Sequence, residues 1–92
     1  METTIVICVD SFDFRNWIFE NYGLGTRNGS KEIVIGDNRI IGVCRPEHLI
    51  GYRCNSVKHT VNALGLNNFN RMLEVANSHC LWIKIKPFKF GR

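Results

Sequence analysis

The chain has 92 residues, a formal net charge of +4 and a hydrophobic content of 45%. This length fits one domain spanning residues 1–92, and the apolar content excludes a disordered chain. The apolar run Ile5–Val9 is too short for a membrane span or a signal peptide, so we expect a cytoplasmic protein without membrane contact. In such a reducing compartment the four cysteines are expected as free thiols.

The amino-terminal half predicts a buried strand, a helix and a hairpin. Thr3–Val9 is almost wholly apolar and rich in β-branched residues, which is typical of a strand that is covered on both faces. We expect Asp13 to cap a helix that ends at Gly23, because aspartate is favoured before the first helical turn and glycine after the last. Two further strands are expected at Glu32–Gly36 and Arg39–Arg45, joined by a tight turn.

The carboxyl-terminal half predicts two helices and a last strand. The first helix is expected from Asn55 or Ser56 to Leu64, and the second from Asn67 or Asn68 to about residue 78. Residues 81–86 alternate between aliphatic side chains and a tryptophan or lysine, which is the pattern of a half-buried strand. The proline that follows cannot donate a ladder hydrogen bond, so this strand is expected at an edge of the sheet.

This order of elements predicts an α+β two-layer sandwich. The four strands are expected to form an antiparallel sheet in ferredoxin-like βαββαβ order, with the helices on one face. The other face would then be open to solvent or to a partner. The RNA-recognition motif has the same strand order but carries aromatic residues on its first and third strands. Residues 5–10 and 39–45 contain none, so we do not place the chain in that family.

The excess positive charge is concentrated between residues 84 and 92. That segment holds four basic groups and no acidic group, whereas residues 1–83 hold eight of each. Basic side chains near phosphates release counterions, and an exposed aromatic ring stacks on an unpaired base. We therefore predict a contact strip for a nucleic acid or a nucleoprotein complex. The contact strip comprises Trp82, Lys84, Lys86, Phe88, Lys89 and Arg92.

The leading functional hypothesis is thus a small cytosolic binding protein without catalysis or cofactor. The alternative is a protein-binding inhibitor or regulator, of the kind that a phage directs against a host protein complex. In that case the open sheet face or the last edge strand would bind the partner, with exposed aromatic side chains as the energetic centre. Pairing of the edge strand with a second copy into a homodimer is a further expectation.

Other patterns carry weaker predictions. The two expected helices resemble a helix-turn-helix unit around Gly65, but Arg71 stands where that unit needs an apolar contact. Two cysteine–histidine pairs offer the thiolate and imidazole ligands that zinc prefers, although no tight knuckle joins them, and zinc binding stays open. These residues are Cys44, His48, Cys54 and His59. A cysteine and a histidine close in sequence do not make a catalytic triad, so we expect no catalytic residue.

Overall fold

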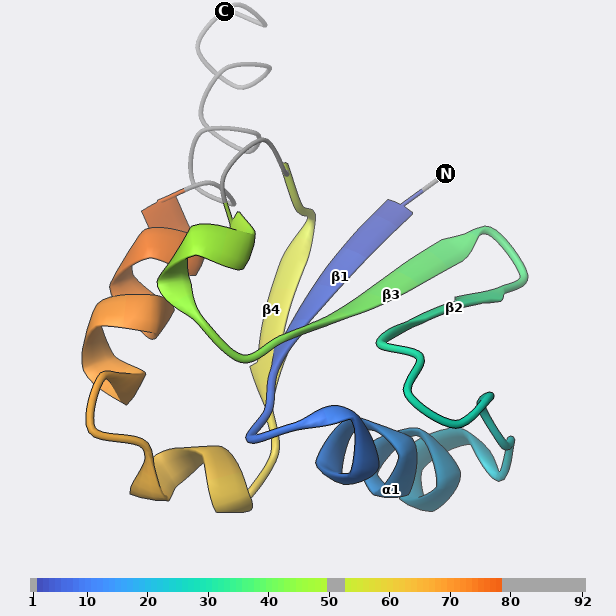
Figure 1. Ribbon diagram of the computed structural model, residues 1–92. Helices are drawn as coiled ribbons and strands as arrows, with labels where there is room; N and C mark the ends of the chain where they lie inside the picture. Colours follow the sequence, from blue (N-terminus) through green and yellow to red (C-terminus); the bar gives the residue numbers. More distant parts are fainter. Residues whose placement is uncertain (1, 50–52, 79–92) are drawn as a thin grey trace, which may run out of the picture.

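The structure is a computed structural model that describes residues 2–49 and 53–78. This part of the chain forms an α+β fold with a four-stranded sheet and two helices (Figure 1). The strands are β1 (Glu2–Ile7), β2 (Glu32–Ile35), β3 (Asn38–Val43) and β4 (Ser56–His59). The helices are α1 (Ser11–Tyr22) and a helix at residues 69–78, and two short 3-10 helices are η1 (Pro46–Leu49) and η2 (Asn62–Gly65). Neither these nor any other described helix has the length and apolar character needed to cross a membrane.

The sheet is mixed, with strand order β2-β3-β1-β4. Strand β1 is central and pairs in parallel with both β3 and β4, and among the strands of the described residues only β2 and β3 pair in an antiparallel hairpin (Figure 1). The predicted fully antiparallel ferredoxin-like order is therefore wrong. The predicted α+β class and the buried first strand are confirmed. The predicted hairpin is also confirmed, and Gly36 in its turn has the positive φ of 60° that a tight turn needs.

The main error in the element prediction is the helix expected from Asn55 or Ser56 to Leu64, which is instead strand β4 followed by η2. The apolar spacing of this segment is compatible with a helix, but pairing with β1 decides its conformation. The Asn55 side chain accepts a hydrogen bond from the Thr3 amide at 2.8 Å, and the Ser56 and Thr4 hydroxyls lie 2.9 Å apart. The predicted helix pair is therefore absent from residues 53–78, and with it the helix-turn-helix unit. The second predicted helix is confirmed at residues 69–78.

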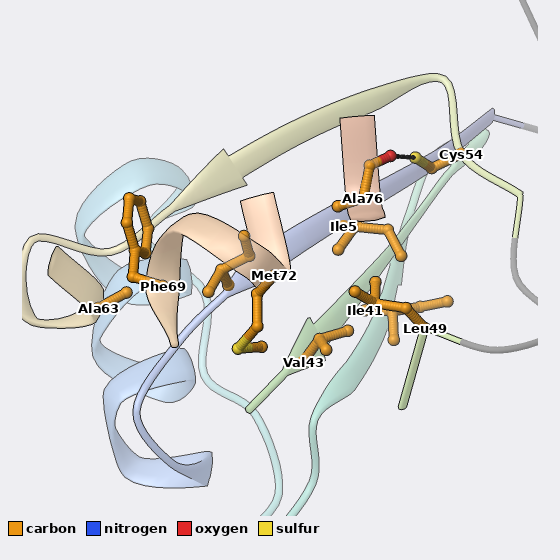
Figure 2. Packing of buried hydrophobic residues seen from close by; sticks show 10 residues of the cluster. Ile5, Ile41, Val43, Leu49, Cys54, Ala63, Phe69, Met72 and Ala76 are labelled. Carbon is orange, nitrogen blue, oxygen red and sulfur yellow. Dashed lines mark hydrogen bonds between the residues drawn. The ribbon is translucent and has the colours of Figure 1, made fainter. Parts of the chain in front are cut away.

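Both faces of the central strands are covered, which corrects the prediction that all helices lie on one face. Successive side chains of a strand point to opposite faces. On one face, Val6 of β1 and Ile40 of β3 pack against Phe14 and Ile18 of α1. On the other face, a second cluster fills the space between the sheet, η1 and the helix at residues 69–78 (Figure 2). This cluster contains Ile5, Ile7, Ile41, Val43, Leu49, Cys54, Ala63, Phe69, Met72 and Ala76.

Helix α1 begins one turn earlier than predicted. Its N-cap is Asp10, whose Oδ1 accepts a hydrogen bond from the Asp13 amide at 2.8 Å. Asp13 lies inside the first turn and is buried, so its carboxylate is available for contacts with other elements. The predicted end at Gly23 is confirmed, because this residue has a φ of 69° and its amide donates to the Phe19 carbonyl at 2.8 Å.

Candidate functional site at the carboxyl ends of β1 and β3

The parallel pair of strands β1 and β3 creates a topological switch point. The connection that leaves β1 enters α1 on one face of the sheet, and the connection that leaves β3 enters η1 on the opposite face. In open sheets with parallel strands, ligands bind in the crevice that such diverging connections leave at the carboxyl ends of the strands. The fold therefore directs attention to the residues that directly follow Ile7 and Val43.

A cavity of about 500 Å³ lies at this position. Its wall is formed by the β1–α1 connection, by the loop before β2, and by the segment that runs from β3 into η1. The lining carries two basic side chains, an aspartate, a histidine and a thiol, so it is polar and chemically reactive. The lining residues are Val9, Asp10, Ser11, Gly29, Lys31, Cys44, Arg45 and His48. We refer to this cavity as the switch-point cleft.

Two free cysteines meet at the base of the switch-point cleft. Cys8 follows β1 and Cys44 follows β3, and their Sγ atoms lie 3.8 Å apart. Cys8 is fully buried against α1, whereas Cys44 is partly exposed and lines the cleft. The Lys31 Nζ lies 3.8 Å from the Cys44 Sγ and donates to it. The prediction of free thiols is confirmed for these two residues and is wrong for Cys54, which is disulfide-bonded.

The electrostatic environment shifts the pKa values of the two thiols in opposite directions. A hydrogen bond from the Cys8 thiol, together with the Lys31 ammonium group, lowers the pKa of Cys44 to about 6, against the opposing effect of burial. The hydrogen bond to Cys44 and the burial of Cys8 raise the pKa of Cys8 far above its ordinary value. Cys44 is therefore the thiolate at neutral pH and Cys8 remains a protonated thiol. A thiolate is the nucleophilic form of cysteine, so Cys44 is the reactive member of the pair.

This difference gives a direct prediction for alkylation by iodoacetamide. The rate at Cys44 should follow its thiolate fraction and therefore reach half its plateau near pH 6. An ordinary cysteine reaches half its plateau near pH 8.5. Stopped reactions analysed by peptide mass spectrometry would give the rate at each cysteine. Lys31→Ala should move the midpoint of Cys44 to higher pH. Lys58→Ala is the matched control, because this exposed lysine of β4 does not line the cleft. A midpoint near pH 8.5 in the unmodified protein would contradict the prediction.

The wall of the site is held in place by the buried carboxylate of Asp13. Its Oδ2 accepts hydrogen bonds from the Val9 amide at 2.9 Å and from the Thr60 hydroxyl at 2.5 Å. Its Oδ1 accepts from the Asn62 side chain at 3.0 Å. One side chain thus joins the end of β1, the start of α1 and the segment that follows β4. Asp10 and Asp13 therefore have different roles, since Asp10 caps the helix and Asp13 forms this junction.

The four zinc candidates are not brought together. Cys44 and His48 line the switch-point cleft, whereas Cys54 lies in the cluster on the opposite face of the sheet, 3.7 Å from the Ala76 carbonyl (Figure 2). The His59 ring makes an edge contact with Phe69, with ring centroids 5.2 Å apart. Within residues 2–49 and 53–78, no group of three or more histidine, cysteine or acidic side chains could hold a metal ion.

The predicted contact strip and the last strand lie outside the described residues. The switch-point cleft, in turn, was not predicted from the sequence. Its signal was present, because Cys8 and Cys44 each directly follow an apolar β-branched strand. Only the parallel pairing of β1 with β3 aligns the two positions, and an antiparallel sheet would have separated them. No protein-family model, curated protein or solved structure matches this chain, so the site is assigned from its own geometry.

Proposed function

We propose that the protein is a small non-catalytic binding protein that contacts a nucleic acid or a nucleoprotein complex. The observation that carries this proposal is the distribution of charge. The described residues hold eight basic and eight acidic groups, and the whole excess of four positive charges falls in residues 84–92. The contacts are assigned to Trp82, Lys84, Lys86, Phe88, Lys89 and Arg92.

The chemistry of this segment suits a polyanion with accessible bases. Each lysine or arginine that neutralises a phosphate releases a condensed counterion, and this gain depends on the salt concentration. Each aromatic ring that stacks on a base contributes about 1–3 kcal/mol without selecting a sequence. Residues 82–92 contain both kinds of side chain, so affinity for single strands without strong base preference is expected.

Binding of a labelled single-stranded oligonucleotide tests this proposal. The logarithm of the association constant should fall linearly with the logarithm of the salt concentration. Replacing Lys84, Lys86 and Lys89 with alanine should reduce the slope by about 2, since each phosphate contact on a single strand contributes about 0.7. Fluorescence anisotropy between about 20 and 300 mM salt gives both slopes. A triple variant with the same slope, or the absence of binding at low salt, would contradict the proposal.

A second candidate function is a protein-binding inhibitor or regulator. The observation that favours it is an exposed aromatic pair on α1, where Phe12 and Phe19 are 66% and 64% exposed. These residues are seven positions apart and therefore lie on the same side of the helix. Large aromatic side chains on a surface are typical of energetic hot spots in protein interfaces. The sheet face expected to bind a partner is covered over β1 and β3, so α1 replaces it as the proposed surface.

The two candidates are separated by one capture experiment with nuclease treatment. A nucleic-acid function predicts that captured material is released by nuclease and lost in the triple lysine variant. A protein-binding function predicts a defined protein that survives nuclease and is lost when Phe12 and Phe19 are replaced by serine. Asn16→Ala on the exposed side of α1 is the control for the aromatic pair. A captured protein that both variants retain would contradict the second candidate.

A further inference from the structure

The partly exposed Cys44 and the buried Cys8, which lie at the carboxyl ends of β3 and β1, have no role in either proposed function. Cys44 opens to a cavity of about 500 Å³, and Cys8 lies directly behind it with no access to solvent. The Sγ–Sγ distance of 3.8 Å is within van der Waals contact. A substrate can therefore reach the Cys44 thiol but not the Cys8 thiol, and Cys8 can react with Cys44.

The backbone geometry is compatible with a bond between the two sulfurs. The last aligned residues of the parallel pair are Ile7 and Val43, so Cys8 and Cys44 are the next pair in register. Neighbouring strands lie about 4.8 Å apart, which is within the range of about 4.4–6.8 Å that disulfides span between Cα atoms. Both residues lie just beyond the ends of the strands, so rotation of the side chains can shorten the Sγ–Sγ distance to about 2.05 Å.

The charges around the cleft indicate which substrate it accepts. The side chains that line the cavity around Cys44 include two cations, Lys31 and Arg45, against one carboxylate, Asp10, and the Lys31 ammonium group contacts the Cys44 sulfur. A bound metal cation is disfavoured beside an ammonium group, and the described residues supply no third ligand. An anionic molecule is favoured, because its carboxylates would lie near the two cations while its reactive centre meets the thiolate.

We propose that Cys44 and Cys8 form a dithiol exchange site for low-molecular-weight disulfides that carry carboxylate groups. The Cys44 thiolate attacks one sulfur of the substrate disulfide, which forms a mixed disulfide on Cys44 and releases the first substrate thiolate. The Cys8 sulfur then attacks the Cys44 sulfur, the Cys8–Cys44 bond forms, and the bond between Cys44 and the substrate breaks. The second substrate sulfur leaves with the proton of Cys8. In sum, the dithiol is oxidised by two electrons and the substrate disulfide is reduced to two thiols.

The buried position of Cys8 fixes the order of these steps. A substrate reaches only Cys44, so the mixed disulfide forms on Cys44 and Cys8 resolves it. The pKa values agree with this assignment, because Cys44 is the thiolate and Cys8 the protonated thiol. The site is independent of the proposed nucleic-acid contacts, since none of its residues belongs to the segment 82–92.

The test uses the full chain and two disulfides of similar size and opposite charge. Dithiodipropionate is the anionic probe and cystamine the cationic control. The protein with Cys8 and Cys44 as free thiols should react about tenfold faster with dithiodipropionate, and the formation of the Cys8–Cys44 bond should remove two hydrogen atoms. Lys31→Ala should bring the ratio of the two rates close to one. Lys58→Ala should leave the ratio unchanged, since this lysine does not line the cleft.

Variants of the two cysteines test the order of the steps. Cys8→Ala should stop the reaction at a mixed disulfide on Cys44, because the resolving thiol is missing. Cys44→Ser should leave Cys8 unmodified. Peptide mapping of the unmodified protein must place the new bond between Cys8 and Cys44. A bond from Cys44 to any other cysteine, or a mixed disulfide that persists in the unmodified protein, would overturn the proposal even if a variant fails to fold. Equal rates with both probes would overturn the substrate assignment.

Discussion

Replacing Asp13 with alanine is expected to lower the free energy of unfolding by about 3 kcal/mol. Asp13 is only 6% exposed, and its carboxylate accepts hydrogen bonds from the Val9 amide, the Thr60 hydroxyl and the Asn62 amide group. Alanine would leave these three donors without their acceptor. The Thr60 hydroxyl is buried, and a buried donor without a partner costs about 1–3 kcal/mol, whereas the Val9 and Asn62 donors are partly exposed and add less. For a domain of this size the loss is a large fraction of the total stability.

Urea denaturation of the variant and of two controls would measure this effect. Asp10→Ala removes only the N-cap hydrogen bond of α1 and should cost about 1 kcal/mol. Asp13→Asn keeps one acceptor oxygen and should fall between the two. The m-value should stay unchanged, because the same surface is exposed on unfolding. If Asp13→Ala costs no more than Asp10→Ala, the junction between β1, α1 and the segment after β4 does not stabilise the fold as described.

Replacing Gly42 with alanine is expected to cost about 2 kcal/mol or more, because no space exists for a side chain between β3 and α1. A Cβ atom at this position would lie 2.7 and 2.9 Å from the Cδ1 and Cγ atoms of Phe14 and 3.2 Å from the Cys8 Sγ. The Phe14 ring is fully buried and part of the cluster under α1, so it cannot move away without disturbing that cluster. The missing side chain is therefore what lets α1 approach the sheet.

The matched control for this substitution is Gly25→Ala. A Cβ atom at Gly25 would have no neighbour within 4 Å, and its backbone needs no positive φ. That variant should remain within about 0.5 kcal/mol of the unmodified protein. Phe14→Leu in the Gly42→Ala background should recover about 1 kcal/mol through a double-mutant cycle, because the smaller side chain relieves the close contact. The absence of coupling between the two positions would contradict this account of the packing.

The elements that the sequence predicted correctly are those with a strong local signal. The apolar run that forms β1, the turn at Gly36 and the helix end at Gly23 each depend on residues close in sequence. Strand β4 was not predicted for the opposite reason, because its conformation depends on hydrogen bonds to β1 that span about fifty positions of sequence. Its own apolar spacing fits a helix, and nothing local indicates the partner strand.

The candidate site was missed because the sheet was predicted to be fully antiparallel, whereas β1 and β3 pair in parallel. Cys8 and Cys44 are neighbours only if β1 and β3 run in parallel, and Lys31 reaches Cys44 from the loop before β2. An antiparallel sheet offered no reason to connect these three positions. The charge distribution, by contrast, needs no fold to be recognised, and it remains the basis of the proposed nucleic-acid contacts in residues 82–92.

The placement of β1 at the centre of the sheet also affects how the chain reaches its native state. Both partners of β1 are distant in sequence, with Ile5 aligned to Ile41 on one side and to Val57 on the other. During synthesis β1 therefore stays unpaired until β3 and β4 have been made. Pairing between segments so distant in sequence is slow. An unpaired segment that is apolar and rich in β-branched residues is prone to aggregate. Production of soluble protein should therefore benefit from slow synthesis at low temperature.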